Sequence, residues 1–378
     1  MSSITRRSMS LALLAGGMRA AWPTMPGFGI ADLAFAAERG RSVKVTQELD
    51  LPTRGAATAV CWAPDGSALA AASWYGEDLT VWDKSGSVIS RFKRLGGGPY
   101  VFNSLAFVNG ASALLFPPPQ TPDNSTSLDV WDIATGKILK TVPGPDPDST
   151  NYARNRAEQF VVSADQSIAA AAPTVGGAVA IYETKDWTRT GMFKSAYAVA
   201  SLALFPDGRR LAVGGLTRGH FYIVDTASAR ILADVAAYVT KFANVSIGAI
   251  AVSPDAELVV TGFGLTTIPG EYYRAPEART WEQFVPPAVS VWRVSDGSHV
   301  AGFGAVRHPV GQVAWDPKSR FVAFVDSAST LFIWQPTAAE NNIQRISLSG
   351  DTMSVAVDPS GDRVAVTYAR GVRVYRIQ

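Results

Sequence analysis

The alternation of apolar and polar residues predicts short β-strands, arranged in seven copies of one motif. In each copy an apolar strand leads into a tight turn built around Pro-Asp or a related pair, as in CWAPDGSALAAAS and ALFPDGRRLAVGG. A second apolar run comes next and often ends on an aromatic residue, as in TVWD and SVWR. Such alternation with a period of two is typical of half-buried strands. The seven copies begin at Cys61, Ala106, Val161, Ala203, Ala251, Ala314 and Ala356.

Four strands, a to d from the centre outward, fit into each copy. In the first copy they are expected at 59–63, 68–73, 79–83 and 88–92. Four-stranded repeats of roughly 40 to 60 residues are typical of propeller blades. The sequence therefore predicts an all-β, seven-bladed β-propeller of four-stranded antiparallel blades. The blades are expected at about 57–92, 103–142, 157–193, 200–235, 248–303, 311–348 and 353–378.

The last copy stops after its strand c, at Gln378, and needs a fourth strand from elsewhere. The segment Ser42-Val43-Lys44-Val45-Thr46 alternates as a strand does and precedes the first copy. We therefore expect a closing strand at about 42–49 that completes the last blade. This closure would place both ends of the domain in one blade and remove an open sheet edge.

Aromatic residues at the end of strand c point to a known family. Trp82-Asp83 and Trp131-Asp132 are WD dipeptides, and Trp292 and Trp334 keep the aromatic residue. On these residues the chain resembles a divergent bacterial WD40-like propeller, similar to the WD-repeat, YVTN-like and lactonase-like seven-bladed groups. The family's Gly-His pair before strand a is absent from every copy, so the family's buried His-Asp-Ser/Thr-Trp network is not expected. The one Gly-His pair, Gly219-His220, is expected in a b–c loop.

Residues 1–36 have the pattern of a signal peptide. The segment Thr5-Arg6-Arg7-Ser8-Met9-Ser10 resembles the twin-arginine (Tat) export motif, and a weakly apolar stretch lies next to it at 11–17. Ala34-Phe35-Ala36 fits an A-x-A cleavage site. We expect export to the periplasm, cleavage after Ala36 and a single propeller domain over 37–378. An ordinary secretory signal with a chance arginine pair is the alternative, and the apolar stretch is too short for a transmembrane segment.

Composition and charge exclude several functions. The chain is 47% apolar and 17% charged, which suits a globular domain. Its formal net charge is +2, and residues 1–36 carry three arginines against one aspartate, so the remaining domain is close to neutral. Nucleic acid is therefore not an expected partner. The single cysteine, Cys61, excludes an internal disulfide and is expected to be a buried structural thiol.

No catalytic or metal site is predicted. The strand-a residues expected at the loop-rich end of the central channel include no histidine or carboxylate: Ala59, Ser104, Gln159, Ser201, Ala249, Gln312 and Ser354. A hard cation would need several converging carboxylates. The three histidines, His220, His299 and His308, are not expected to meet. We therefore predict no catalytic residue, no metal and no cofactor.

Long connections are expected on one face of the ring, where the b–c and d–a links lie. They include 117–127, 143–156 and an insertion at 264–287 in blade 5. Long loops of this kind are usually functional, and aromatic and arginine residues are favoured at binding hot spots. The predicted binding residues are Tyr272, Tyr273, Arg274, Trp281 and Phe284 of the insertion, with Tyr100, Tyr152, Arg154, Arg156, Tyr238, Trp74 and Tyr75.

The sequence thus favours a non-catalytic platform that binds a protein or peptide partner in the periplasm. Two alternatives stay open. The insertion could be a structural lid over blades 4 to 6, or the chain could be a lactonase-like or quinoprotein-like enzyme with a small-molecule or cofactor site at the channel mouth.

Overall fold

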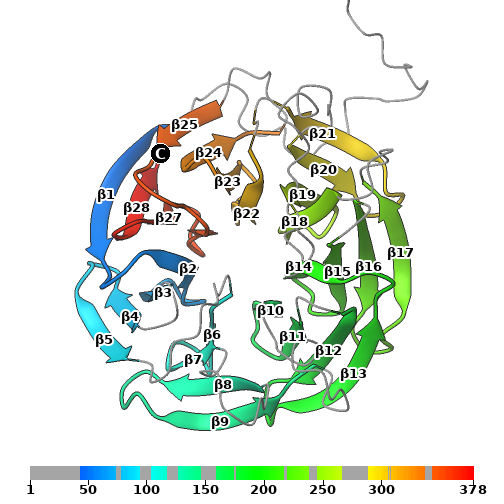
Figure 1. Cartoon of the computed structure of the whole chain (residues 1–378), viewed down its shortest axis with the longest axis horizontal. Coiled ribbons are helices and arrows are strands. Elements are labelled where there is room, and N and C mark those ends of the chain that lie inside the picture. Colours follow the sequence, from blue (N-terminus) through cyan, green and yellow to red (C-terminus); the bar gives the residue numbers. More distant parts are fainter. Residues whose placement is uncertain are drawn as a thin grey trace, which may run out of the picture. The chain divides into compact units, whose positions relative to one another are not determined.

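The computed structural model describes residues 43–73, 78–93, 104–116, 127–145, 159–173, 176–216, 219–237, 245–265, 288–304, 306, 308–336 and 343–378. These residues form seven four-stranded antiparallel sheets arranged in a ring (Figure 1). No helix occurs among them. The prediction of an all-β, seven-bladed propeller is confirmed.

Six blades use four consecutive strands, ordered from the centre outward. They are blade 1, β2 (Ala57–Trp62), β3 (Ala68–Ser73), β4 (Asp78–Asp83) and β5 (Val88–Lys93); blade 2, β6 (Ala106–Val108), β7 (Ala113–Phe116), β8 (Ser127–Asp132) and β9 (Ile138–Pro143); blade 3, β10 (Gln159–Val162), β11 (Ile168–Ala172), β12 (Ala178–Glu183) and β13 (Thr188–Lys194); blade 4, β14 (Val199–Leu204), β15 (Arg210–Gly215), β16 (His220–Asp225) and β17 (Ile231–Ala236); blade 5, β18 (Val245–Val252), β19 (Leu258–Leu265), β20 (Val289–Arg293) and β21 (His299–Phe303); and blade 6, β22 (Val310–Trp315), β23 (Val322–Asp326), β24 (Thr330–Trp334) and β25 (Ile343–Ser347).

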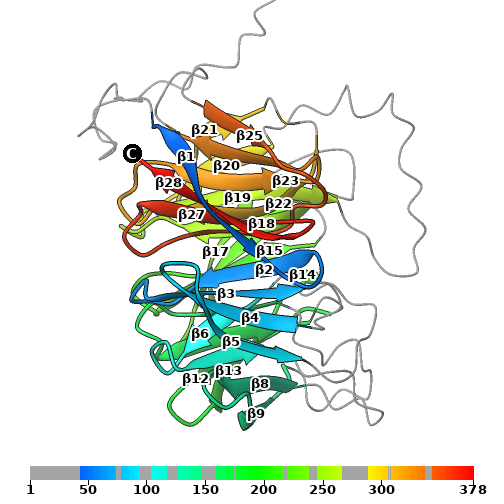
Figure 2. The same cartoon turned by 90° about the vertical axis from the view of Figure 1, so that its left-hand side faces the viewer.

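Blade 7 is built from the first strand and the last three strands of the described chain. It holds β26 (Val355–Val357), β27 (Arg363–Tyr368), β28 (Gly371–Ile377) and, as its outer strand, β1 (Val45–Pro52). β1 pairs antiparallel with β28, from Val45 opposite Ile377 to Pro52 opposite Gly371 (Figure 2). The predicted closure is therefore present, but β1 spans Val45–Pro52, so it begins and ends three residues later than the expected 42–49.

β1 contains a bulge near its middle. The register slips between Gln47 and Leu49, so a simple two-residue alternation does not continue through the strand. Beyond the bulge, Leu51 is buried and Leu49 is partly buried against the cluster formed by blades 1 and 7. These two leucines are the apolar contacts that anchor the second half of the strand.

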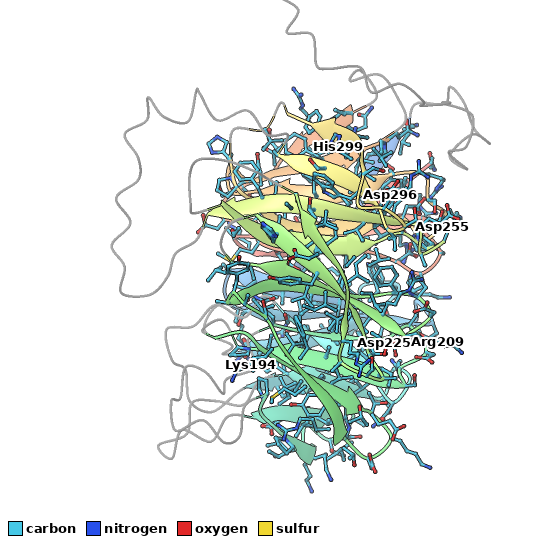
Figure 3. All side chains as sticks on the ribbon, turned by 90° about the vertical axis from the view of Figure 1, so that its right-hand side faces the viewer. Lys194, Arg209, Asp225, Asp255, Asp296 and His299 are labelled. Atoms are coloured by element: carbon cyan, nitrogen blue, oxygen red, sulfur yellow. The ribbon has the colours of Figure 1, made fainter. Side chains whose placement is uncertain are left out.

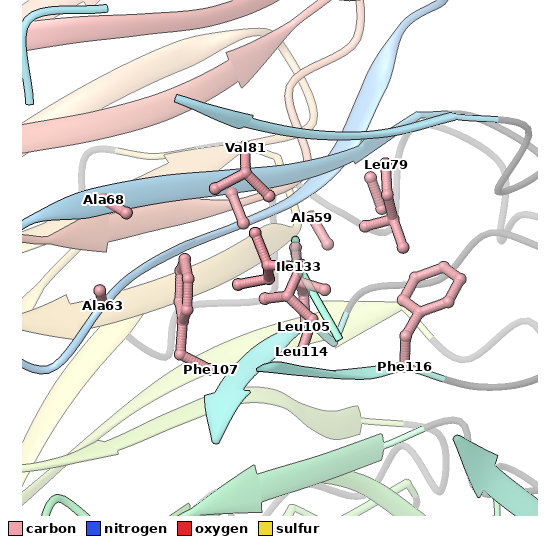
Figure 4. Packing of buried hydrophobic residues seen from close by; sticks show 12 residues of the cluster. Ala59, Ala63, Ala68, Leu79, Val81, Leu105, Phe107, Leu114, Phe116 and Ile133 are labelled. Carbon is pink, nitrogen blue, oxygen red and sulfur yellow. The ribbon is translucent and has the colours of Figure 1, made fainter. Parts of the chain in front are cut away.

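The core lies between neighbouring blades. In blade 1 small residues occupy the inner strand β3, where Ala70 and Ala72 are fully buried. Blade 2 places larger side chains on its inner strands: Phe107 of β6 and Phe116 of β7 belong to one cluster with Leu79 and Val81 of blade 1 (Figure 4).

Cys61 packs at the edge of the same cluster and is partly buried. Burial raises the pKa of its thiol. The thiol is therefore protonated at neutral pH and unreactive as a nucleophile, which agrees with the structural role expected for it.

A side-chain hydrogen bond joins strands b and c of blade 5. The buried indole Nε1 of Trp292 on β20 donates to Thr261 Oγ1 on β19 over 2.8 Å.

Short turns joining strands a to b and c to d lie on one face, which we call the turn face. Figure 3 shows Asp225, Asp255 and Asp296 on this side of the ring and Lys194, the last residue of β13, on the other. Aspartate side chains stabilise these turns through hydrogen bonds. Asp132 Oδ1 accepts hydrogen bonds from the backbone N and the hydroxyl of Thr135, as Asp83 does from Ser85.

These hydrogen bonds make the turn carboxyls more acidic, chiefly through the hydroxyl donors. The pKa values of Asp83, Asp132 and Asp225 lie below the ordinary value of 3.8. A carboxyl whose folded pKa is depressed contributes stability above its unfolded pKa and loses it as the pH falls through the folded pKa. We expect the urea midpoint to be lower at pH 3 than at pH 7, and the difference to shrink in the variant Asp83→Asn with Asp132→Asn. Equal midpoints at the two pH values would contradict this role for the turn carboxyls.

Candidate functional site

The described strand ends place the predicted functional connections on the face opposite the turn face, which we call the loop face. β19 ends there at Leu265 and β20 begins there at Val289. The strand ends that border the blade 2 loop, Phe116 and Ser127, lie on the same face. The loop face is therefore the side on which the long connections leave and re-enter the ring.

All twelve predicted binding residues lie outside the described residues. These are Tyr272, Tyr273, Arg274, Trp281, Phe284, Tyr100, Tyr152, Arg154, Arg156, Tyr238, Trp74 and Tyr75. Their grouping into one surface stays a prediction.

The first two residues of the predicted blade 5 insertion, Gly264 and Leu265, belong to the described part of the chain, and they lie in a β-strand. Gly264 and Leu265, which the sequence assigns to the insertion, pair as strand residues with Ser246 and Val245. The expectation that these two residues are loop is wrong, because glycines here permit a close approach of two strands. A Cβ added to Gly248 would lie 2.9 Å from the Cα of Gly264. β18 and β19 are each eight residues long, so the insertion leaves the ring from a firmly paired hairpin.

A small cavity lies among the inner strands. It has a volume of about 120 Å³ and includes five of the seven residues expected at the channel mouth: Ser104, Gln159, Ser201, Ala249 and Gln312. Met353, Phe160, several aliphatic side chains and two glycines, Gly248 and Gly311, complete the described lining. None of these lining residues carries a titratable side chain.

Polar side chains at the cavity are engaged in hydrogen bonds between blades. Gln312 Oε1 of blade 6 accepts from Ser354 Oγ over 2.6 Å and from the backbone N of Val355 over 3.0 Å, both in blade 7. Ser354 Oγ in turn accepts from the backbone N of Val60 in blade 1. These contacts join three consecutive blades, so the polar lining has a structural role.

A second bond of this kind joins blades 4 and 5. Ser201 Oγ donates to the carbonyl oxygen of Ile247 over 2.7 Å, and the side chain of Ser201 is buried. The cavity therefore presents groups that already hold the ring together, rather than a set of free acids and bases.

The histidines do not form a common site in the described part of the chain. His220 Nδ1 lies 2.9 Å from Asp234 Oδ1 on the outer strands of blade 4, and its ring lies 6.0 Å from that of Tyr197. His299 packs edge-on against Trp292 with a centroid distance of 5.0 Å, and burial lowers its pKa. His308 is exposed in the link into blade 6.

The His220–Asp234 pair is a feature that the sequence does not indicate. The sequence predicts a b–c loop at His220, but this residue is the first of β16, because the strand begins directly after Gly219. Asp234 lies fourteen positions later on β17, and only the pairing of β16 with β17 brings the two together. Among the described residues no group of three or more His, Cys, Asp or Glu side chains could hold a metal ion.

The chain matches no family model and no curated protein sequence. Among solved structures it is similar to hydrazine synthase of Kuenenia stuttgartiensis, with 16% sequence identity and a TM-score of 0.67. The match covers 87% of this chain and 97% of that chain. At this identity the likeness shows the propeller fold alone. The described residues include no helix long and apolar enough to cross a membrane.

Proposed function

We propose that this chain is a non-catalytic propeller that binds a protein or peptide partner through the long connections of the loop face. The observation that carries the proposal is the contrast between the two faces. The turn face consists of short turns whose carboxylates are already bonded within the turn. The loop face receives the long connections from sheets that are tied to one another near the ring centre.

A rigid ring suits this role for an energetic reason. Association is weakened by the cost of ordering the groups that meet, and a preformed frame lowers that cost. Aromatic and arginine side chains on such a frame are the residue types that dominate binding energy at interfaces. The insertion after Leu265 contains both types.

Two features argue against catalysis at the channel. The cavity is small beside the range of about 300 to 1,000 Å³ that ligand pockets usually have, since its volume is about 120 Å³. General acid–base catalysis also needs a positioned titratable group, and the described lining offers none.

An enzyme with a small-molecule site at the channel mouth is the second candidate. The presence of a partly polar cavity where the sequence places the channel mouth favours it. Metal analysis of the purified protein and hydrolysis of a panel of lactones test this candidate. Bound metal together with turnover would favour the enzyme over the platform.

The central experiment replaces residues 266–287 with a short Gly-Ser linker between Leu265 and Ala288. We expect the melting temperature to stay within a few degrees of that of the whole chain, while cross-linking to the partner is lost. The matched control replaces 118–126 of blade 2 in the same way. This loop holds none of the twelve predicted binding residues, so we expect cross-linking to the partner to be retained. A large fall in melting temperature would instead identify the insertion as a structural lid. Retained cross-linking with an intact fold would refute the proposal.

The proposed location is the periplasm, supported by the arginine pair and the A-x-A site of residues 1–36. Replacing Arg6 and Arg7 with lysine should leave the precursor in the cytoplasm if the twin-arginine route is used. Normal export of that variant would favour the general secretory route.

A further inference from the structure

Exposed aliphatic side chains gather on the outer strands of neighbouring blades. In the described part of the chain, every large hydrophobic residue that is exposed lies on β5, β9, β13 or β17, which succeed one another around the ring (Figure 1). These residues are Val88, Ile89, Ile138, Leu139, Met192, Ile231 and Leu232. Their exposed fractions lie between 46% and 57%. A cluster of this kind marks an interaction surface more often than isolated exposed residues do.

The charge on three of these strands is of one sign. β5, β9 and β13 carry five basic residues, Arg91, Lys93, Lys140, Arg189 and Lys194, and no aspartate or glutamate. Of these, Arg91, Lys140, Arg189 and Lys194 are exposed. We call the exposed residues of β5, β9 and β13 the basic rim. The nearby turn carboxylates Asp83, Asp132 and Asp186 accept hydrogen bonds within their own turns, and Asp186 also attracts Lys140 electrostatically.

Backbone groups add a third feature. Each of the three strands is the last strand of its described sheet, so one side of its backbone faces outward without a neighbouring strand. β9 is the most open, because Ile138, Leu139, Lys140 and Thr141 are all exposed. An outer strand with free backbone groups can accept an added strand from another chain.

We propose that the basic rim binds an extended acidic segment of a partner protein, in which carboxylate and aliphatic side chains alternate. The backbone of that segment would pair with one outer strand, most readily with the part of β9 that follows the bulge between Ile138 and Lys140. Its carboxylates would meet Lys140 and the neighbouring Arg91 or Arg189, and its aliphatic side chains would cover Ile138 and Leu139. This surface is separate from the loop face, so the inference does not depend on the proposed function.

The geometry favours a flexible segment over two other occupants. Seven blades in a ring turn each outer strand by about 50° from the next, so a flat lipid surface can reach only a small part of the rim. A second copy of this chain would bring the same positive rim to the contact. Like charges placed together oppose association.

The test uses a fluorescent twelve-residue peptide of alternating glutamate and valine, with binding measured by anisotropy at low and high salt. We expect binding to the whole chain that weakens with salt and falls about tenfold when Lys140→Glu and Arg189→Glu are combined. Ile138→Ser with Leu139→Ser should weaken binding as well. Lys140→Glu alone and Arg189→Glu alone should each weaken binding. The matched control for these single variants is Arg209→Glu, which reverses one charge at an exposed a–b turn of blade 4 (Figure 3) and should leave binding unchanged. The 266–287 replacement should leave peptide binding unchanged.

Three results would overturn the proposal. The peptide could fail to bind, or it could bind equally to the rim variant and the Arg209→Glu control. Alternatively, phosphatidylglycerol vesicles could bind in a rim-dependent way while the peptide does not, which would assign the rim to lipid. Circular dichroism of each variant checks that the fold is retained.

Discussion

A chain shortened to begin at Thr53 is expected to melt far below a chain that begins at Val43, because only the shorter one lacks β1. β1 supplies the outer strand of blade 7 along its whole pairing with β28. It also contributes Leu51, which is 4% exposed, and the partly buried Leu49 and Val45. At about 1.5 to 3 kcal/mol for a fully buried aliphatic side chain, these residues stabilise the ring by several kcal/mol.

Polar contacts made by β1 add to the stability that the shortened chain loses. Glu48 Oε1 accepts hydrogen bonds from Arg363 over 2.7 Å and from Arg376 over 2.8 Å. Asp50 Oδ1 accepts from the hydroxyl of Tyr368. Removing the strand leaves these groups of β27 and β28 without their partners and exposes the edge of β28. The total is a large fraction of the roughly 5 to 15 kcal/mol that stabilises most domains.

Calorimetry and size-exclusion chromatography of the two chains provide the measurement. We expect the chain from Thr53 to melt at least 10 °C lower, by the relation between free energy and melting temperature for domains of this size, and to aggregate through the open edge. The chain from Val43 is the control and should melt as the whole chain does. Equal melting temperatures for both chains would show that blade 7 is stable with three strands.

The architecture could be predicted because each blade repeats the same local signals. A turn that needs Pro-Asp chemistry and a strand that ends on an aromatic residue are both encoded within a few positions. β1 is harder to place, because the bulge at Gln47 and Leu49 breaks the alternation on which the prediction depends. Gly264 suggests a loop in isolation, and only the close approach of Gly248 explains why it lies in a strand.

The site is less predictable because its contacts join distant parts of the sequence. Five residues expected at the channel mouth do line one cavity. Their bonds to other blades could not be foreseen: Gln312 meets Ser354 across 42 positions, and Ser354 meets Val60 across 294. A pattern of residue types indicates which side of a strand is buried, but it does not indicate which polar partner the neighbouring blade presents.

Arg320→Ala is expected to destabilise the ring by about 3 kcal/mol, as the loss of one partner from a buried ion pair usually does. The side chain of Asp316 is 0% exposed, and its Oδ2 accepts from Arg320 Nε over 2.7 Å. Arg320 also donates to the carbonyl oxygen of Gly361, so the pair joins the a–b turns of blades 6 and 7. Without the guanidinium, the buried carboxylate of Asp316 keeps, among the described residues, only the backbone N of Arg320 as a hydrogen-bond donor.

Removing the other partner, in the variant Asp316→Ala, should lower the free energy of unfolding by less. In Asp316→Ala the guanidinium loses its partner, but the side chain of Arg320 is 26% exposed and can turn toward water. Arg320→Lys should fall between the two alanine variants, because an ammonium keeps the charge and cannot form the two-pronged contact. Urea midpoints at pH 7 give the order of the three.

Lys318→Ala is the matched control, since it lies in the same turn and also reaches blade 7. Its pair with Asp362 has a distance of 2.8 Å, but both side chains are about half exposed, at 50% and 49%. Exposed pairs of this kind contribute about 0 to 1 kcal/mol. If Arg320→Ala and Lys318→Ala shift the midpoint equally, burial of Asp316 does not determine the strength of this link. A shift at least three times larger for Arg320→Ala would show that the two blades depend on one buried carboxylate.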